Sequence, residues 1–371
     1  MFKKESNNLL NISMSIIVFF IVFYILYIGA SLIIPFIIAL LFSFAIIGLS
    51  NYFRSFKIPV IISFILSLGT YIFIIWLLWK MLGTNLQDLI RLLPDYQQKV
   101  YNMLSQAFQY FHIPVPASLG EILSSLNLQS IFTSVLSGFT SIFSSAGIIL
   151  FYVLFILLEY RYFKKKLNLM MLDDNNKKNV IETIEKIKRD IKSYFVIKTI
   201  VSLITALLSY IIMMLFGLDF ALFWSLLIFI LNFIPNIGSI IAVLLASLFS
   251  LIQFDSYYSF LLIISGLTSI QVLMGNIIEP KYMGNKLNLS PLVIIIALGF
   301  WGAIWGIVGM ILSVPIMVIL NIIFAKIPST RNIAIFMSEK GELQIDGAEE
   351  VIKTRKKIVH IVANKIFKNN K

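Results

Sequence analysis

The sequence of 371 residues contains no cysteine and only two histidines, His112 and His360. The lack of cysteine excludes disulfide bonds, thiolate nucleophiles and cysteine-ligated zinc or iron–sulfur centres. The two histidines lie far apart in the chain, so they cannot form the pair one helical turn apart that zinc hydrolases carry on a helix. We therefore expect neither a metal site nor a cofactor.

Charged residues are also scarce: they make up 13% of the chain, whereas apolar residues make up 59%. An average globular domain is about 25% charged and about 45–50% apolar. A soluble protein of this length would need polar residues over its whole surface, but here they are crowded into a few short stretches. This composition excludes a soluble enzyme and predicts an all-α, polytopic membrane protein.

Eight apolar regions can be distinguished. Two of them are too long for a single crossing, and each is interrupted near its middle: region 220–252 at Pro235–Gly238 and region 290–325 at Gly299–Gly302. Each is either two short crossings or a re-entrant hairpin, and we expect about eight transmembrane helices in all. The other six regions are mostly long enough to cross a core of about 30 Å as helices; they cover residues 12–28, 32–49, 59–79, 146–160, 199–217 and 258–278.

The net charge of +12 is unevenly distributed. Lysine and arginine gather at the N-terminus, in the loop with Arg54 and Lys57, in segment 159–198 and in segment 326–371. The positive-inside rule places these segments in the cytoplasm, with both termini. Together with residues 279–286 they carry +14, and the remaining loops carry −2. No basic cluster is combined with aromatic stacking residues, so nucleic acid is not an expected partner.

These patterns divide the chain into four parts. Residues 1–82 hold transmembrane helices 1–3, and residues 83–138 form extracytoplasmic amphipathic helices punctuated at Pro94. Residues 139–325 form the transmembrane core, which includes a cytoplasmic amphipathic helix at 173–195, and residues 326–371 are a basic cytoplasmic tail. The apolar face of 83–138 packs on the membrane core or on a neighbouring subunit, or else forms an external lid.

Breaks in a transmembrane helix are costly, because lipid cannot satisfy the exposed backbone groups, so a break must be buried or line a wet cavity. In secondary transporters, a pair of Gly/Pro-interrupted segments marks the substrate site. This chain has such a pair, one at Asn232–Ser239 and the other between Gly299 and Gly309. The alternative is that proline and glycine only kink closely packed helices.

The stretch 271–284 is the most polar part of the predicted spans. Gln271, Gly275 and Glu279 are four residues apart and therefore share a helix face. Because an intramembrane carboxylate is expensive unless it has a function, Glu279 is a candidate for binding H⁺ or Na⁺. The alternative is a salt bridge with Lys281 at the membrane interface.

A family resemblance rests on these motifs. One motif begins at Gln271, continues through Gly-Asn-Ile-Ile-Glu-Pro-Lys-Tyr-Met-Gly and ends at Leu289-Ser290-Pro291. It is followed by Gly302, Gly306, Gly309 and Pro315. With Tyr194, Lys198, Thr199, Ser202 and the segment 231–238 upstream, it resembles the signature of the autoinducer-2 exporter-like (AI-2E) family of transporters. The resemblance implies a multi-pass protein of the cell (plasma or inner) membrane. It also implies a relation to exporters of autoinducer-2 and to Na⁺(Li⁺)/H⁺ antiporters.

We therefore predict a secondary transporter, not an enzyme, that exports a small polar solute such as autoinducer-2 and is coupled to an ion gradient. A Na⁺(Li⁺)/H⁺ antiporter and a non-transporting membrane scaffold are the alternatives. Expected partners are the solute, H⁺ or Na⁺, and membrane lipid, with a homo-oligomer left open. The predicted substrate-pathway residues are Asn232, Pro235, Asn236, Gly238, Gln271 and Asn276. The predicted ion-coupling residues are Glu279 and Lys198; the Lys198 side chain either extends to the membrane surface or pairs with a carboxylate. The predicted hinge or packing residues are Pro280, Gly302, Gly306 and Gly309.

Overall fold

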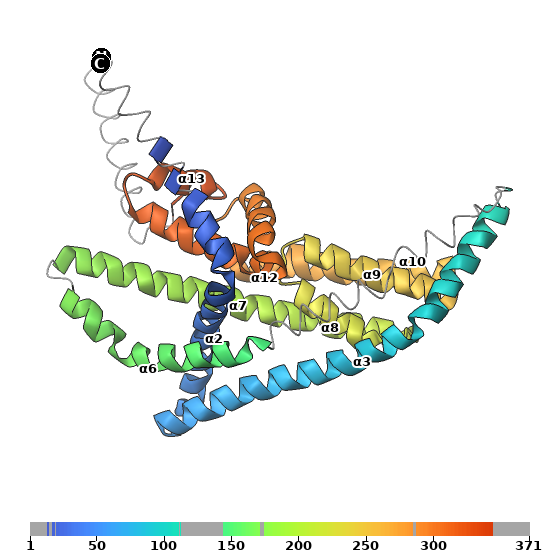
Figure 1. The fold of residues 1–371 in the computed structure, drawn as a ribbon, viewed down its shortest axis with the longest axis horizontal. Coiled ribbons are helices and arrows are strands. Elements are labelled where there is room, and N and C mark those ends of the chain that lie inside the picture. Colours follow the sequence, from blue (N-terminus) through green and yellow to red (C-terminus); the bar gives the residue numbers. More distant parts are fainter. Residues whose placement is uncertain are drawn as a thin grey trace, which may run out of the picture. The chain divides into compact units, whose positions relative to one another are not determined.

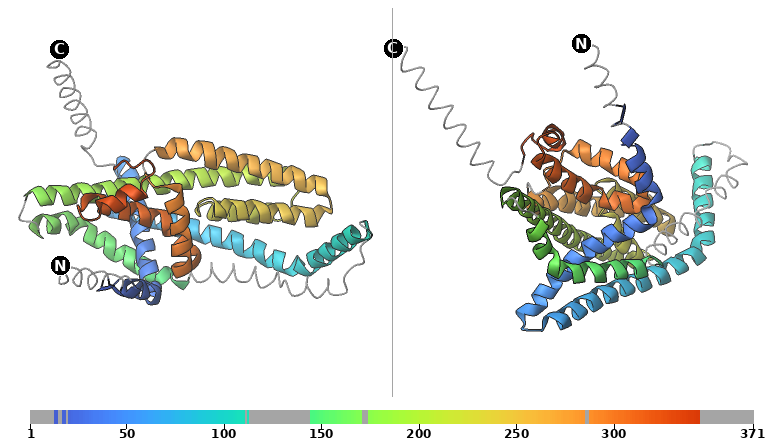
Figure 2. Two further views of the ribbon diagram at one scale, coloured as in Figure 1. Left: turned by 90° about the horizontal axis from the view of Figure 1, so that it is seen from above. Right: turned by 60° about the vertical axis from the view of Figure 1, so that its left-hand side comes forward.

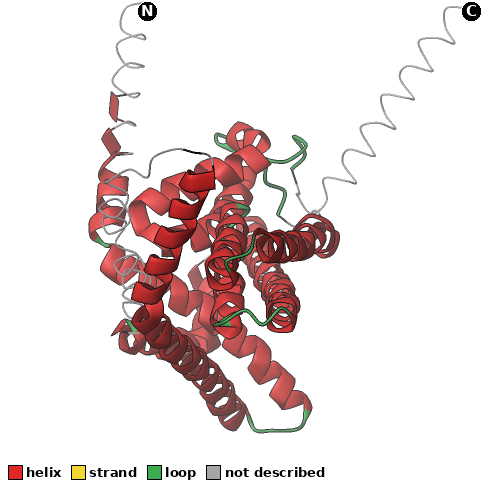
Figure 3. Ribbon diagram, turned by 90° about the vertical axis from the view of Figure 1, so that its right-hand side faces the viewer, coloured by secondary structure: helices red, strands yellow, loops and turns green. Residues whose placement is uncertain are grey.

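The computed structural model describes residues 20–110, 112, 144–170, 174–284 and 287–343, together with residues 13, 14, 17 and 18. Within these residues the chain is helical and has no strand (Figure 3). Six of the described helices are long and apolar enough to span a membrane, and two shorter apolar helices, Ala146–Tyr160 and Ala221–Leu231, accompany them. The predicted all-α, polytopic membrane architecture is confirmed.

The chain divides into two compact units, each with segments from distant parts of the sequence. The first unit comprises Met1–Leu172 and Phe195–Tyr282, and the second comprises Asp173–Tyr194 and Met283–Lys371. Helix α7 (Asp174–Leu215) contributes its first half to the second unit and its second half to the first. The predicted amphipathic helix 173–195 and the predicted span 199–217 thus form one continuous helix.

The first two predicted spans are not separated by a loop. Residues 20–28 are helical, and α2 (Ala30–Ser55) follows at once. Helical hydrogen bonds continue through the junction, because Gly29 N–H donates to the carbonyl of Ile25 and Ile33 N–H donates to the carbonyl of Gly29. The described parts of the predicted spans 12–28 and 32–49 are therefore joined without a loop. Residues 12, 15, 16 and 19 lie outside the described residues, and the two crossings and the cytoplasmic N-terminus stay predictions.

Helices α2, α3 (Val60–Tyr110) and α6 (Ala146–Met170) pack together in the first unit. Their core consists of Ala39, Ile46 and Val153. Small polar residues add to the contact, since the hydroxyl groups of Ser50 and Ser63 form a hydrogen bond between α2 and α3 at 2.8 Å. Small side chains and interhelical hydrogen bonds are typical of helix packing in membranes, where lipid removes the hydrophobic drive for association.

Helix α3 is much longer than the span that it contains. The apolar window Val60–Leu78 is long enough to cross the membrane, and the helix then continues without interruption to Tyr110 (Figure 2). Pro94 lies inside the helix, so the expectation that it ends one is wrong. The predicted boundary at residue 82 falls within this helix, because an amphipathic sequence can extend a transmembrane helix beyond the lipid. Residues 113–138 of the predicted external segment lie outside the described residues.

The rest of the first unit is a set of antiparallel helices around an aromatic core. Helices α8 (Ala221–Leu231), α9 (Ile237–Phe254) and α10 (Tyr257–Gln271) follow one another with short turns, and α9 packs on both α8 and α10 (Figure 1). A seven-residue π-helix, η1 (Val272–Ile278), and the short α11 (Glu279–Met283) extend α10. The core includes Phe223, Trp224 and Phe249, together with Leu89 and Tyr96 from α3.

The second unit is built on α12 (Pro291–Lys326) and α13 (Arg331–Met337). Helix α12 is not straight: Gly306 has φ 62° and ψ −143°, a conformation that is essentially restricted to glycine. The sequence placed the interruption at Gly299–Gly302, and the structure moves it to Gly306. Glycine allows a break without specifying one, so the sequence could not choose among the four glycines of this stretch.

Candidate functional site

The first predicted break is a tight helical hairpin. Helix α8 ends at Leu231, five residues turn the chain, and α9 begins at Ile237. Asn236 adopts a positive φ of 57°, which asparagine tolerates better than most residues. Gly238, in the first turn of α9, is buried against the carbonyl oxygen of Leu231, from which an added Cβ would lie only 1.9 Å away. Helices α8 and α9 fold back on each other. Two short crossings and a re-entrant hairpin both have this shape, so the choice between them stays a prediction.

The second break has the same construction in the other unit. Gly306 reverses the chain, and Gly309 lies against the carbonyl oxygen of Trp301, from which an added Cβ would also lie 1.9 Å away. Asn321 Nδ2 donates to the carbonyl of Asn288 at 3.2 Å, although 33 residues separate them. A straight helix of that length would hold the two residues about 50 Å apart. Helix α12 is therefore a hairpin of two arms (Figure 1).

Three polar side chains connect α7, the α8–α9 turn and the end of α10. Asn232 Nδ2 donates to Ser202 Oγ at 3.0 Å, and Gln271 Nε2 donates to Asn232 Oδ1 at 3.3 Å. Ser202 and Asn232 are buried, at 0% and 3% exposure. The Oε1 atom of Gln271 is buried and has no hydrogen-bond partner within the described part of the chain. The row therefore ends in an acceptor that is ready to receive a hydrogen bond from a ligand.

An ion pair lies one helical turn along α7 from this row. Lys198 Nζ and Glu279 Oε1 are 2.6 Å apart, and their side chains are 6% and 16% exposed. Lys198 precedes Ser202 by four residues and so faces the same side of α7. Of the two alternatives predicted for Lys198, snorkelling or pairing with a carboxylate, the structure shows the pairing. The partner of Glu279 is this distant lysine and not Lys281, which is exposed.

A π-helix lies between Gln271 and Glu279. In η1 the backbone bonds extend over five residues, and Glu279 N–H donates to the carbonyl of Met274. Such segments are rare and often occur at functional sites, because they rotate the following side chains relative to an α-helix. The packing of Gln271 over Gly275 agrees with their predicted common face, since a Cβ on Gly275 would lie 3.2 Å from Gln271 Nε2. No sequence pattern predicted this π-helix.

The structure brings together only part of the predicted site. Lys198, Asn232, Gln271 and Glu279 form one polar cluster with Ser202, which the sequence analysis had used only as a family motif. The spacing of Lys198 and Ser202 on one face of a span was the available signal for Ser202. Asn236, Asn276 and Pro280 are exposed and take no part in these contacts, Pro235 lies in the turn before α9, and Gly302, Gly306 and Gly309 belong to the second unit.

Comparison with known proteins agrees with this placement of the motifs. The profile of the family described as AI-2E family transporter matches residues 14–329. This chain belongs to the AI-2E transporter family. It is 31% identical to the AI-2 transport protein TqsA of Escherichia coli (strain K12), over 84% of this chain and 90% of that protein. It is also 27% identical to a transport protein of Haemophilus influenzae, over 84% of this chain and 91% of that protein. The chain is thus a multi-pass membrane transporter.

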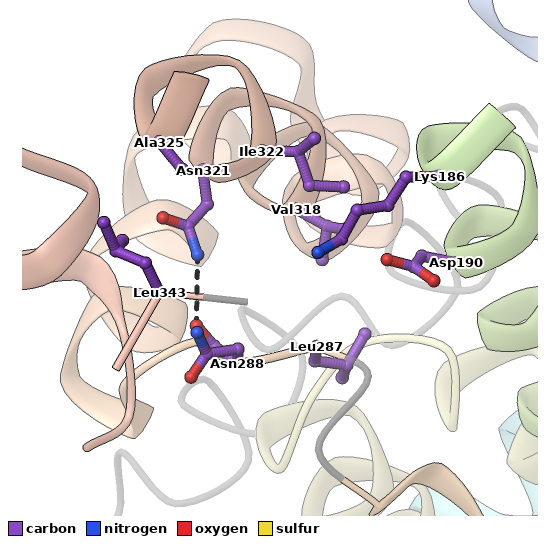
Figure 4. A pocket seen from close by; sticks show the side chains of 9 residues that line it. All are labelled: Lys186, Asp190, Leu287, Asn288, Val318, Asn321, Ile322, Ala325 and Leu343. Carbon is purple, nitrogen blue, oxygen red and sulfur yellow. Dashed lines mark hydrogen bonds between the residues drawn. The ribbon is translucent and has the colours of Figure 1, made fainter. Parts of the chain in front are cut away.

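This AI-2E transporter carries a second polar site within its second unit. A small pocket there is lined on one side by Lys186 and Asp190 of α7, both 6% exposed, and on the other by Asn288 and Asn321 (Figure 4). Asn321 Oδ1 is buried and lacks a hydrogen-bond partner among the described residues, while Asn288 Nδ2 donates to the carbonyl of Glu342. These bonds hold the two ends of the α12 hairpin to the segment that follows α13.

A third polar group joins the extended helix α3 of the AI-2E chain to the α7–α8 turn. Tyr96 OH donates to Asp219 Oδ2 at 3.3 Å, and the Tyr96 ring packs edge-on against Phe249. Lys99 Nζ donates to the carbonyl of Gln253 and lies over the Tyr96 ring. Burial, followed by the negative charge of Asp219 and the hydrogen bond to it, raises the pKa of Tyr96 to about 12. The phenol is therefore held in its neutral form.

Proposed function

We propose that this AI-2E transporter exports a small polar solute across the cell membrane, with autoinducer-2 as the first candidate, and that export is coupled to an ion gradient. The observation that carries the proposal is the polar cluster of Lys198, Ser202, Asn232, Gln271 and Glu279 inside otherwise apolar helices. Polar and ionisable groups within spans mark solute or ion pathways, because they are costly there without a function. The name of the relative TqsA supplies the candidate solute.

The row from Ser202 to Gln271 offers the chemistry for a hydroxylated solute. Amide side chains both donate and accept hydrogen bonds, so they can bind a hydroxyl group in either role. The free Oε1 of Gln271 would accept a hydrogen bond from a hydroxyl of the solute. Asn236, Asn276, Pro235 and Gly238 remain proposed as residues along the solute path rather than as direct ligands.

Glu279 is proposed to carry the coupling H⁺ or Na⁺, with Lys198 as its counterpart. Lys198 already occupies the carboxylate at 2.6 Å, so an entering cation has to displace the ammonium group. Cation entry would thereby open the contact between α7 and α11. Gly302, Gly306, Gly309 and Pro280 are proposed as hinge or packing positions that accommodate such a change, and a homo-oligomer remains a proposed assembly.

Export can be tested in an Escherichia coli strain that lacks TqsA. Cells that produce this chain should accumulate less autoinducer-2 inside and release more of it than cells with an empty vector. The Glu279→Gln variant should lose at least about 90% of this export, because it removes the proposed ion ligand. Equal intracellular autoinducer-2 with and without the protein, at confirmed membrane expression, would rule out this solute.

A second candidate, the Na⁺(Li⁺)/H⁺ antiporter, is favoured by the same ion pair, because a buried carboxylate next to a displaceable ammonium is also a cation site. Inverted vesicles separate the two functions. The antiporter predicts Na⁺- or Li⁺-dependent dissipation of a proton gradient that disappears in Glu279→Gln. The exporter predicts autoinducer-2 transport in vesicles in which no such Na⁺ or Li⁺ effect occurs.

A further inference from the structure

The Lys198–Glu279 pair accounts for all the buried charge of the second half of the first unit. Residues 195–283 contain five charged side chains: Lys198, Asp219, Asp255, Glu279 and Lys281. Asp219, Asp255 and Lys281 are exposed, whereas Lys198 and Glu279 are buried or nearly so. The polar cluster is therefore electrically neutral, and its neutrality depends on two residues that are 81 positions apart in the sequence.

The pair also lies next to the row of hydrogen-bonding side chains, on the same two helical elements. Lys198 and Ser202 are one turn apart on α7, which is a rise of about 6 Å. On the opposite side, Gln271 and Glu279 follow each other along the α10–η1–α11 rod, with only Gly275 between them on the face that Gln271 covers. Gln271 and Glu279 are eight residues apart along this rod, a rise of about 10–12 Å. A solute held by Gln271 Oε1 would therefore lie close enough, in surroundings of low dielectric constant, to be attracted or repelled by whatever net charge the pair leaves.

We propose that the Lys198–Glu279 pair is the specificity determinant that restricts this site to uncharged, hydroxylated solutes. The proposal rests on the proposed function, because it concerns the solute bound at the same cluster. A charged solute entering an apolar site must lose its hydration, and an opposite charge in the site is the strongest compensation for that loss. With ammonium and carboxylate satisfying each other, the site has no such charge for an anionic or a cationic solute, and a coupling H⁺ or Na⁺ reaches Glu279 only by displacing the ammonium group.

The sign of the charge selectivity should depend on which partner of the pair is removed. Glu279→Gln leaves the positive charge of Lys198 without a partner, so the site should favour anions. Lys198→Gln leaves the carboxylate of Glu279, so the site should favour cations. The double variant Lys198→Gln/Glu279→Gln removes both charges and retains neutrality, so it should keep the preference for uncharged solutes. This double variant separates the effect of net charge from the effect of losing the contact itself.

The test uses the full-length protein in proteoliposomes and three solutes that share one five-carbon hydroxylated chain. These are ribitol, which is neutral, ribonate, which is an anion at pH 7, and ribitylamine, which is a cation at pH 7. Counterflow of each labelled solute needs no ion gradient, so a loss of coupling does not obscure the result. Thermal stability of each purified variant, measured in parallel, shows whether it is folded.

Wild-type protein and the double variant should move ribitol at least about tenfold faster than either charged analogue, since an uncompensated charge costs several kcal/mol. Glu279→Gln should raise the ratio of ribonate to ribitol about tenfold or more, and Lys198→Gln should do the same for ribitylamine. If a single variant does not fold, the double variant still tests the proposal. Loss of the preference for ribitol in the double variant would overturn it. Unchanged ratios in folded single variants would also overturn it.

The same experiment distinguishes this proposal from the proposed function. Wild-type protein that moves autoinducer-2, but moves ribonate or ribitylamine as readily as ribitol, would overturn the charge selectivity and leave export intact. Wild-type protein that moves neither autoinducer-2 nor any of the three analogues would overturn both. Ribitol counterflow without autoinducer-2 transport would support the selectivity and reject that particular solute.

Discussion

Gly309 lies directly against the main-chain carbonyl oxygen of Trp301, eight residues before it, and an added Cβ would come within 1.9 Å of that oxygen. The hairpin of the other unit repeats this relationship between Gly238 and the carbonyl of Leu231. In both hairpins, a glycine in the second arm lets the backbone of the first arm approach more closely than any side chain would permit. Each break is thus closed by a backbone contact and not merely by a flexible turn.

Replacing either glycine by alanine should prevent the hairpin from closing. The clash is with backbone, which cannot rotate away, so we expect Gly238→Ala and Gly309→Ala each to destabilise the protein by about 3 kcal/mol or more. Gly299→Ala is the matched control, because nothing lies within 4 Å of a Cβ at that position. Thermal unfolding and size-exclusion profiles of the purified variants measure the effect, and wild-type stability of Gly309→Ala would contradict the hairpin geometry.

The buried ion pair should show strong coupling between its partners. Removing one charge of a buried pair costs about 3–5 kcal/mol, because the other charge is left uncompensated, whereas neutralising both costs much less. Lys198→Gln and Glu279→Gln should therefore each lower the free energy of unfolding more than the double variant does. A double-mutant cycle from thermal or denaturant unfolding measures this coupling, and additive losses would show that the pair does not act as a unit.

Much of the fold could be predicted because the bilayer imposes strong constraints on sequence. Long apolar runs, the polar α7 extension and the two interrupted regions were each visible as local composition, and each corresponds to a structural element. Predictions that needed a decision at a single residue were less successful. Pro94 was expected to punctuate segment 83–138, but helix α3 continues past it, since packing and neighbouring hydrogen bonds override local preference.

The candidate site was only partly accessible from sequence for a different reason. Asn232, Gln271, Glu279 and Lys198 could each be recognised as polar residues in apolar surroundings. The contacts among these residues join positions that are 30 to 81 residues apart in the sequence. A single sequence contains no local signal for contacts over such separations. The π-helix was also hidden, because the sequence of η1 fits an α-helix equally well. Three-dimensional packing alone separates Asn232 from the exposed Asn276.

That separation predicts different effects for two asparagines that looked equivalent in the sequence. Asn232→Ala removes the centre of the row between Ser202 and Gln271, so solute transport should fall at least about tenfold through lost positioning. Asn276 is proposed as a residue along the path and not as a ligand, and its side chain is exposed, so Asn276→Ala should cost much less transport than Asn232→Ala. Counterflow of ribitol and of autoinducer-2 at matched protein amounts measures both. Equal losses in the two variants would indicate that the described cluster does not bind the solute.

The contact between Tyr96 and Asp219 predicts how stability depends on pH at the alkaline end. Burial and the neighbouring carboxylate raise the pKa of Tyr96 from 10.0 to about 12 in the folded protein. Between these two values the unfolded chain loses the phenolic proton while the folded chain keeps it, so the folded state is progressively destabilised. The stabilising contribution of Tyr96 is therefore complete below about pH 10 and is lost as the pH rises towards 12.

Tyr96→Phe removes this titration together with the hydrogen bond to Asp219. The variant should be less stable than wild type at pH 8, but its stability should decline less between pH 10 and pH 12. The two curves of melting temperature against pH should therefore converge over that range. Tyr101→Phe, at a position on the same helix where the side chain is 36% exposed, is the control and should run parallel to wild type. If the curve for Tyr96→Phe also ran parallel to that of wild type, Tyr96 would ionise as an ordinary surface tyrosine. The extension of α3 would then not be held to the α7–α8 turn through this side chain.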